Sequence, residues 1–291
     1  MGNSLREVKL RISSTKSTAQ ITKAMHMVSQ SKVKKSERTY KSYMDFMNRI
    51  EKMVSHVVSK VPDDYVNPLL SQREVKKTCY LLITSDRGLA GPYNSSLFKA
   101  LDDRITENHK EKSEFITAAI GKKGFAFIKK RGYSLLQDDA IFVRDDVMFT
   151  DILPLAKKII DSYLSLEIDK LVIVYNHYVN SLTQEVTLEE LLPIKSVEKT
   201  EEEVDYIYET GIEKTLNLVL QMYIQDMIYG VILDAKTSEH SARMNAMRNA
   251  TDNAEEVIAK LQLLYNRARQ GAITTELIDI IGGANAIGGD N

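Results

Sequence analysis

The sequence predicts a mixed α/β protein, in which a long antiparallel coiled coil of N- and C-terminal helices carries a central Rossmann-like α/β domain. Three observations support this fold class. All five prolines lie between residues 62 and 193, so neither flank contains the strongest helix breaker. The flanks carry opposite charge, a net +9 over residues 1–60 and −8 over residues 200–291. Both flanks also repeat apolar residues at helical spacing. The expected domains are residues 1–61, 62–200 and 201–291.

The N-terminal flank has a heptad pattern. Alternating steps of three and four residues from Leu5 to Val61 fall on one stripe, apolar at both ends and small or polar in the middle. The members are Leu5, Val8, Ile12, Thr15, Ala19, Thr22, His26, Ser29, Val33, Ser36, Tyr40, Tyr43, Met47, Ile50, Val54, Val57 and Val61. A helix of this length is poorly stable alone, so it needs a partner.

The C-terminal flank supplies that partner. The same steps run from Met244 to Ala272, and we expect a helix over about residues 205–281. If both helices meet the central domain at a common level, they pair antiparallel, with Thr15 opposite Thr251. The C-terminal helix then continues unpaired from about Tyr265. Its tip would expose apolar residues unless another protein surrounds it.

The middle of the chain alternates strand and helix patterns. Its apolar runs predict strands at residues 78–84, 115–120, 171–178 and 184–188. Its helices are expected to begin near Ser95 and to cover residues 124–131 and 152–166. This order predicts an open α/β sheet, a fold that often binds nucleotides.

The motifs argue against a nucleotide site. The chain has neither GxxxxGK[ST] nor GxGxxG, and the turn DRGLAG lacks the Lys and the Ser or Thr that hold phosphate and magnesium. We interpret Gly88 and Gly91 as residues that permit a tight exit from the preceding strand. There is no GxSxG either, so no catalytic residue and no cofactor are predicted.

Composition excludes further classes of protein. The single Cys79 excludes a disulfide framework within the chain and a cysteine-based zinc site, and the five histidines lack metal-ligand spacing. The chain contains no run of about 18 apolar residues, so the sequence predicts no membrane-spanning helix. The first residues have no signal-peptide core, so a reducing cytosolic compartment is expected.

Long motifs resemble the gamma subunit of F-type ATP synthase. Residues 241–284 (SARMNAMRNATDNAEEVIAKLQLLYNRARQGAITTELIDIIGGA) resemble the C-terminal helix of that family, and ITKAMHMVSQSKVKK resembles its N-terminal helix. SDRGLAGPYN resembles its central-domain motif, and DYIYE its foot. Departures are small: Ala90 stands where many members have Cys, and Thr210 where many have Pro. The lack of a cysteine-bearing regulatory insert and of a transit peptide favours the bacterial type.

The resemblance implies a non-catalytic rotor shaft in a proton-translocating complex. Its coiled coil would stand inside a ring of three alpha and three beta subunits. The central domain and foot would rest on the ring of c subunits, with the epsilon subunit alongside. The complex would lie at the cytoplasmic face of the bacterial plasma membrane, and the chain would be peripheral to that membrane. Rotation of the c ring would drive the catalytic beta subunits through different conformations.

The resemblance also implies contact residues. Met25 would meet an acidic loop of a catalytic subunit, and a basic stretch of Lys32, Lys34, Lys35 and Arg38 could face acidic loops of the ring. Residues expected to hydrogen-bond the ring are Arg243, Gln270 and Thr274, with Glu276 a weaker match. Tyr206 and Glu209 would face the c ring.

Two other readings of the sequence remain open. A coiled-coil scaffold or adaptor would form a stable homodimer without other subunits. A nucleotide-dependent enzyme would bind nucleotide through the central sheet. Binding of nucleic acid by the basic N-terminal helix is disfavoured, because few aromatic residues are interleaved and no base-reading module is present.

Overall fold

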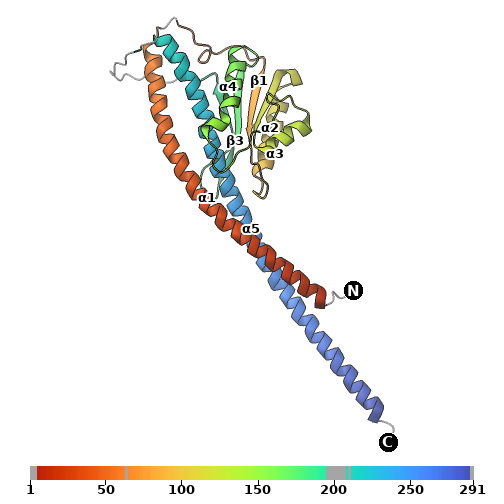
Figure 1. The fold of residues 1–291 in the computed structure, drawn as a ribbon. Helices are drawn as coiled ribbons and strands as arrows, with labels where there is room; N and C mark the ends of the chain where they lie inside the picture. Colours follow the sequence, from red (N-terminus) through yellow and green to blue (C-terminus); the bar gives the residue numbers. More distant parts are fainter. Residues whose placement is uncertain (1–4, 63–64, 195–207, 209–210, 289–291) are drawn as a thin grey trace. The chain divides into compact units, whose positions relative to one another are not determined.

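The computed structural model describes residues 5–62, 65–194, 208 and 211–288. The predicted alternation of helices and strands is confirmed (Figure 1). The elements are α1 (Leu5–Lys60), β1 (Thr78–Ile83), α2 (Tyr93–Asn108), η1 (Lys112–Glu114), β2 (Phe115–Ile120), α3 (Lys122–Arg131), α4 (Phe149–Leu164), β3 (Lys170–Tyr178), β4 (Gln184–Leu192) and α5 (Ile212–Gly288).

The chain divides into two compact units. One comprises residues 29–243, and the other comprises residues 1–28 together with residues 244–291. Both α1 and α5 continue without interruption from one unit into the other. The domains expected from the sequence are three consecutive segments of the chain, a different kind of division, so they stay a prediction.

The larger unit is built on a four-stranded sheet in the order β2-β1-β3-β4. Strand β1 pairs in parallel with β2 and β3, whereas β4 pairs antiparallel with β3. Every residue of β1 is buried, as is usual for a central parallel strand covered on both faces. The predicted open α/β sheet is therefore confirmed.

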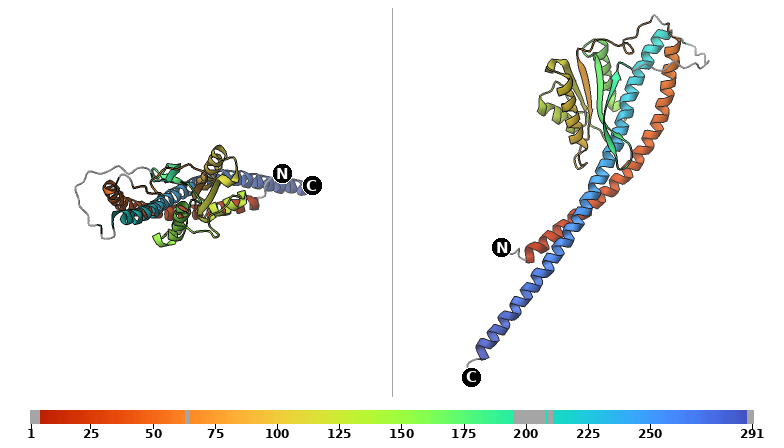
Figure 2. Two further views of the ribbon diagram at one scale, coloured as in Figure 1. Left: turned by 90° about the horizontal axis from the view of Figure 1, so that it is seen from above. Right: turned by 180° about the vertical axis from the view of Figure 1, so that it is seen from behind.

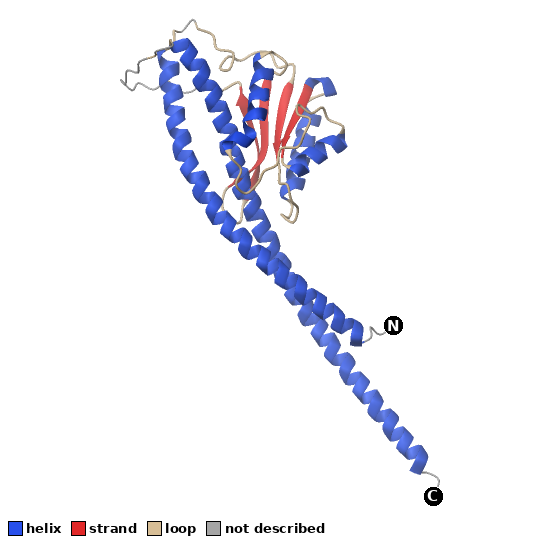
Figure 3. Cartoon of the chain, viewed as in Figure 1, coloured by secondary structure: helices blue, strands red, loops and turns tan. Residues whose placement is uncertain are grey.

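Different helices cover the two faces of the sheet (Figures 2 and 3). On one face, alternate residues of β1, including Tyr80 and Leu82, pack with α2 and α3. On the other, Leu81 and Ile83 share a core with α4 and with the parts of α1 and α5 in this unit. The long helices are thus part of the domain core.

Helix α5 is long and apolar enough, by length and composition alone, to cross a membrane. However, 61% of its most apolar window is buried within the protein. Leu220, Ile224 and Ile232 in this helix are fully buried in the core beside the sheet. Burial in the domain accounts for the apolar character of the helix, as in core helices of other proteins.

In the smaller unit, α1 and α5 pair antiparallel along the predicted stripes. The Thr22 and Thr251 hydroxyls are 2.7 Å apart, and His26 Nδ1 lies 3.0 Å from the Met244 carbonyl. Every member of the α1 stripe is buried or half-buried, in both units. The stripe of α5 is buried or half-buried from Met244 to Ala268. The heptad patterns therefore identified the contact faces correctly.

The predicted register was wrong by one heptad, because Thr251 faces Thr22 rather than Thr15. The error arose at the start of α5. Gly211 adopts a left-handed φ of 87° and the helix begins at Ile212, not near residue 205. A late start of seven residues moves the register by one full heptad and leaves the same stripes in contact.

The end of α5 extends beyond the N-terminal end of α1 (Figure 1). Tyr265 and Ala268 are still half-buried, whereas every residue from 269 to 282 is exposed. The unpaired tip therefore begins after Ala268, slightly later than predicted, as the corrected register requires.

Candidate functional site

The tip of α5 carries three of the predicted contact residues. Gln270, Thr274 and Glu276 are all exposed, and the Thr274 hydroxyl donates a 2.9 Å hydrogen bond to the Gln270 carbonyl. Five large apolar side chains around them, Ile273, Leu277, Ile278, Ile280 and Ile281, are 48–62% exposed. Such an apolar surface on a single helix is typical of a contact with another protein.

The paired region before the tip is narrow. Thr22, Thr251 and Ala254 are buried small side chains, so the two helix backbones approach closely there. One of the Thr22 and Thr251 hydroxyls donates to the other, and the second donates to a carbonyl of its own helix, which offsets the cost of burying them. Met25 is half-buried one turn further along α1, so only part of its side chain is available to a partner.

The predicted basic stretch of α1 is divided. Lys34, Lys35 and Arg38 are exposed. Lys32 instead forms a 2.6 Å ion pair with Asp145, in the loop before α4. Lys32 therefore contributes to contacts within the chain, and the other three cations remain on the surface.

Arg243 lies on α5 and is held by the chain itself. Its guanidinium pairs with Glu239 at 2.7 Å and approaches the Gly88 carbonyl at 3.4 Å, and its side chain is only 12% exposed. Gly88 belongs to the loop after β1. Arg243 thus joins α5 to the motif SDRGLAG, a link that the sequence analysis did not predict.

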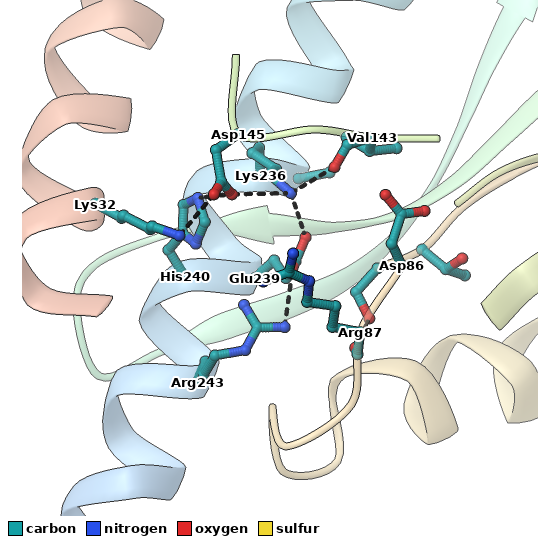
Figure 4. Close-up of polar contacts among 12 residues, drawn as sticks. Lys32, Asp86, Arg87, Val143, Asp145, Lys236, Glu239, His240 and Arg243 are labelled. Atoms are coloured by element: carbon teal, nitrogen blue, oxygen red, sulfur yellow. Dashed lines mark hydrogen bonds and ion pairs between the residues drawn. The ribbon is translucent and has the colours of Figure 1, made fainter. Parts of the chain in front are cut away.

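A buried polar cluster surrounds Lys236, a residue that the sequence analysis missed (Figure 4). The Lys236 ammonium donates to the Val143 carbonyl at 2.8 Å and to Glu239 at 3.0 Å, and it lies 3.6 Å from Asp145. Its side chain is 7% exposed. The available signal was the spacing of Lys236, Glu239, His240 and Arg243, which places four ionisable side chains on one face of the helix.

The charges in this cluster affect one another. The pKa of His240 is lowered to about 4, chiefly by burial, with Lys236 and Arg243 also lowering it and Glu239 and Asp145 opposing them. Burial alone would raise the pKa of Asp145, but its bond to Lys32 and the charges of Lys236 and His240 lower that pKa below its usual value. His240 is therefore neutral and Asp145 ionised at neutral pH.

Residues at and after the end of β1 accept hydrogen bonds from the N-terminus of α3. The Asp86 carboxylate accepts a 2.9 Å hydrogen bond from the Lys122 N–H at the N-terminus of α3, and Thr84 Oγ1 accepts one from Gly124 N–H. These are donors that bind phosphate in nucleotide-binding folds. The geometry agrees with the missing phosphate motifs.

The glycine prediction for this loop is half confirmed. Gly91 has a positive φ of 58° and permits the tight exit, but the other left-handed residue is Leu89, not Gly88. A Cβ on Gly88 would meet no atom within 4 Å. The tightest glycine is Gly121, where a Cβ would lie 2.1 Å from the Thr84 carbonyl oxygen.

The foot residues Tyr206 and Glu209 lie outside the described residues. Within the described part of the chain, no group of three or more His, Cys, Asp and Glu side chains is arranged to hold a metal ion. Cys79 is fully buried, and burial raises the pKa of its thiol to about 12.

Comparisons with known proteins agree with this description. The family model described as ATP synthase matches residues 4–287. A chain from the central stalk and c ring of Tetrahymena thermophila mitochondrial ATP synthase is 27% identical, with a TM-score of 0.59, and the match covers 79% of this chain and 99% of that one.

Two chains of Euglena gracilis mitochondrial ATP synthase share the fold at lower identity. One, from a structure of OSCP, F1 and the c ring, is 19% identical with a TM-score of 0.65, covering 98% of this chain and 94% of the other. The second, from a structure of the rotor, is 17% identical with a TM-score of 0.61, covering 93% and 99%.

Proposed function

Because the chain belongs to the gamma-subunit family of ATP synthase, we propose that its residues work as a mechanical coupling. The chain is the central shaft of the rotor and is not itself catalytic. Its partners are the alpha and beta subunits of the head and the ring of c subunits. Rotation of the c ring reaches the catalytic beta subunits as a change of conformation.

The unpaired tip of α5 is the observation that carries this function. Residues 269–282 expose apolar side chains on a single helix, which other subunits must surround. A scaffold that simply dimerised would continue its paired stripe to the end of the helix. Here the stripe stops at Ala268, and the large apolar residues that follow it are all exposed.

The mechanism rests on differential contact. A shaft made of two helices in one part and one helix in the next is asymmetric, so each orientation presents a different surface to each beta subunit. An orientation shifts a catalytic site only by the difference between its contacts with the two conformations of that site. Narrow pairing at Thr22 and Thr251 keeps the shaft thin where it turns inside the head.

The individual contacts are proposals supported by family motifs and exposure. Gln270, Thr274 and Glu276 are accessible at the tip for hydrogen bonds with the head. Met25 offers a half-buried side chain to an acidic loop, and Arg243 would exchange Glu239 or Gly88 for a partner. Tyr206 and Glu209 would contact the c ring. We also propose the epsilon subunit as a neighbour of the central domain.

The bacterial type and the cytoplasmic face of the plasma membrane are further proposals. The cysteine usage supports a reducing compartment, because the chain has one cysteine in 291 residues. The solved relatives are mitochondrial. Fractionation of source cells tests the location: the chain should sediment with plasma membranes and leave them when the head is stripped at low ionic strength.

Purification of the tagged chain from membranes tests the function. We expect alpha, beta, epsilon and c subunits to co-purify, identified by mass spectrometry, with three alpha and three beta subunits per chain. A homodimer free of other subunits would instead establish the scaffold alternative.

A contact variant tests the tip. Gln270→Ala should lower ATP hydrolysis by the assembled complex several-fold, because a contact that favours one catalytic conformation is lost. The matched control is Gln262→Ala, since Gln262 is equally exposed on α5 but lies before the tip. Equal activity of the two variants would remove Gln270 from the proposed contact set.

A further inference from the structure

The stretch of α5 from residue 231 to residue 241 is buried at every position although it contains ionisable side chains. Asp234, Lys236, Glu239 and His240 are 2–6% exposed. Buried charge is costly unless it is paired, and apolar residues of similar volume are usually at least as stable. Stability alone therefore does not explain why this helix is polar here.

The polar side chains connect α5 to three segments that are far apart in the sequence. Asp234 accepts hydrogen bonds from the Tyr178 N–H at 2.9 Å and contacts His177 at 2.6 Å, both on β3. Lys236 binds the loop at Val143 and Asp145. Arg243 reaches the Gly88 carbonyl in the loop after β1.

The same loop also holds α1. Asp145 accepts the Lys32 ammonium at Oδ2 and faces Lys236 and His240 through Oδ1, at 3.6 and 3.4 Å. One carboxylate therefore contacts both long helices of the larger unit (Figure 4). Lys236 is the buried centre of this arrangement, because its single ammonium contacts a backbone carbonyl and two carboxylates.

Directional bonds fix the position of one element against another more closely than apolar packing does. An apolar helix face tolerates small rotations and slips along its neighbour, whereas the directional bond from the buried Lys236 ammonium to the Val143 carbonyl fixes one register. We propose that Lys236 is a positioning residue for torque: it fixes α5, and through Asp145 also α1, against the central domain. The inference rests on the proposed rotor function. It adds the residues that prevent the long helices from rotating or sliding against the central domain.

The test compares coupling with stability in the assembled complex, reconstituted into vesicles. Lys236→Met keeps the length of the side chain and leaves Glu239 paired with Arg243, but the Val143 carbonyl loses its donor, so the chain should unfold at a somewhat lower temperature than wild type. We expect ATP hydrolysis within about twofold of wild type and ion transport per ATP reduced by about threefold or more. Lys236→Arg, which keeps the charge, should recover part of the transport.

Two controls separate the possible results. Lys157→Met removes an exposed lysine of α4 and should change neither activity. Asp145→Asn removes the link to both long helices and should also reduce transport per ATP, whereas Asp146→Asn, its exposed neighbour, should not. The aspartate pair decides the question if Lys236→Met does not assemble.

Transport per ATP at the wild-type level in Lys236→Met, or equal coupling in the two aspartate variants, overturns the inference and leaves the rotor function intact. A wild-type complex that contains the chain but shows no ATP-driven transport overturns the rotor function instead. A third outcome also overturns the inference: transport per ATP falls in proportion to the unfolding temperature in Lys236→Met, and Lys236→Arg recovers neither. Lys236 would then have a folding role alone.

Discussion

At the scale of single residues, burial makes His240 a source of acid sensitivity. Its pKa is lowered from 6.5 to about 4, first by burial and then by Lys236 and Arg243, against Glu239 and Asp145. The unfolded chain therefore takes up a proton at a higher pH than the folded one. The contribution to stability is complete above about pH 6.5 and is lost as the pH falls toward 4.

Replacing this histidine should remove that sensitivity. In His240→Gln, the free energy of unfolding should fall less than in wild type between pH 6.5 and 4, by an amount on the order of 3 kcal/mol. Urea unfolding of both proteins across this range measures the difference, and other titrating groups cancel in the comparison. Parallel pH profiles would show that His240 does not remain neutral in the folded protein.

Gly121 and Gly88, which follow β2 and β1, give a second prediction at the scale of single residues. Gly121→Ala should cost roughly 2–4 kcal/mol of stability, because the added Cβ meets the Thr84 carbonyl and the residue has a φ of 99°. Gly88→Ala should change stability by less than about 0.5 kcal/mol, since its Cβ meets nothing. Thermal unfolding of the two variants tests this, and a larger loss at Gly88 would contradict the geometry.

At the scale of elements, the register of α1 against α5 can be tested by crosslinking. In a Cys79→Ser background, Thr22→Cys with Thr251→Cys should close rapidly on oxidation, because the two hydroxyls are 2.7 Å apart. Thr15→Cys with Thr251→Cys should stay open, since seven residues along a helix are about 10 Å. Gel mobility without reductant measures closure, and efficient closure of the second pair alone would restore the register first predicted.

The same helices show how far sequence reasoning reaches. Every position of the heptad stripe of α1 is buried or half-buried, because periodicity depends only on which face is apolar. The register depended on where α5 begins, and Gly211 alone did not mark that point in the sequence. The Lys236 cluster was out of reach because its acceptor, the Val143 carbonyl, belongs to a loop whose path no pattern predicts.

At the scale of the whole molecule, the Rossmann-like sheet packs against both long helices, and we predict that it binds no nucleotide. The purified chain should not bind ATP, because Asp86 occupies the N-terminus of α3 and the phosphate motifs are missing. Isothermal titration calorimetry of the isolated chain measures this. Micromolar affinity in a sample free of other subunits would contradict the prediction and revive the enzyme alternative.

The tip of α5 should become more protected from hydrogen exchange when the chain assembles with its partners. A single helix such as residues 269–282 is marginal in water, whereas residues 231–241 of the same helix are buried in the core. In hydrogen exchange of the free chain, the tip should exchange fast and the buried segment slowly. In the complete complex the tip should slow by about tenfold or more, while the buried segment changes little. The buried segment is the internal control, because it belongs to the same helix and is already covered. Protection of the tip in the free monomer would mean that it is stable without a partner, and its exposed isoleucines would then no longer argue for a surrounding head.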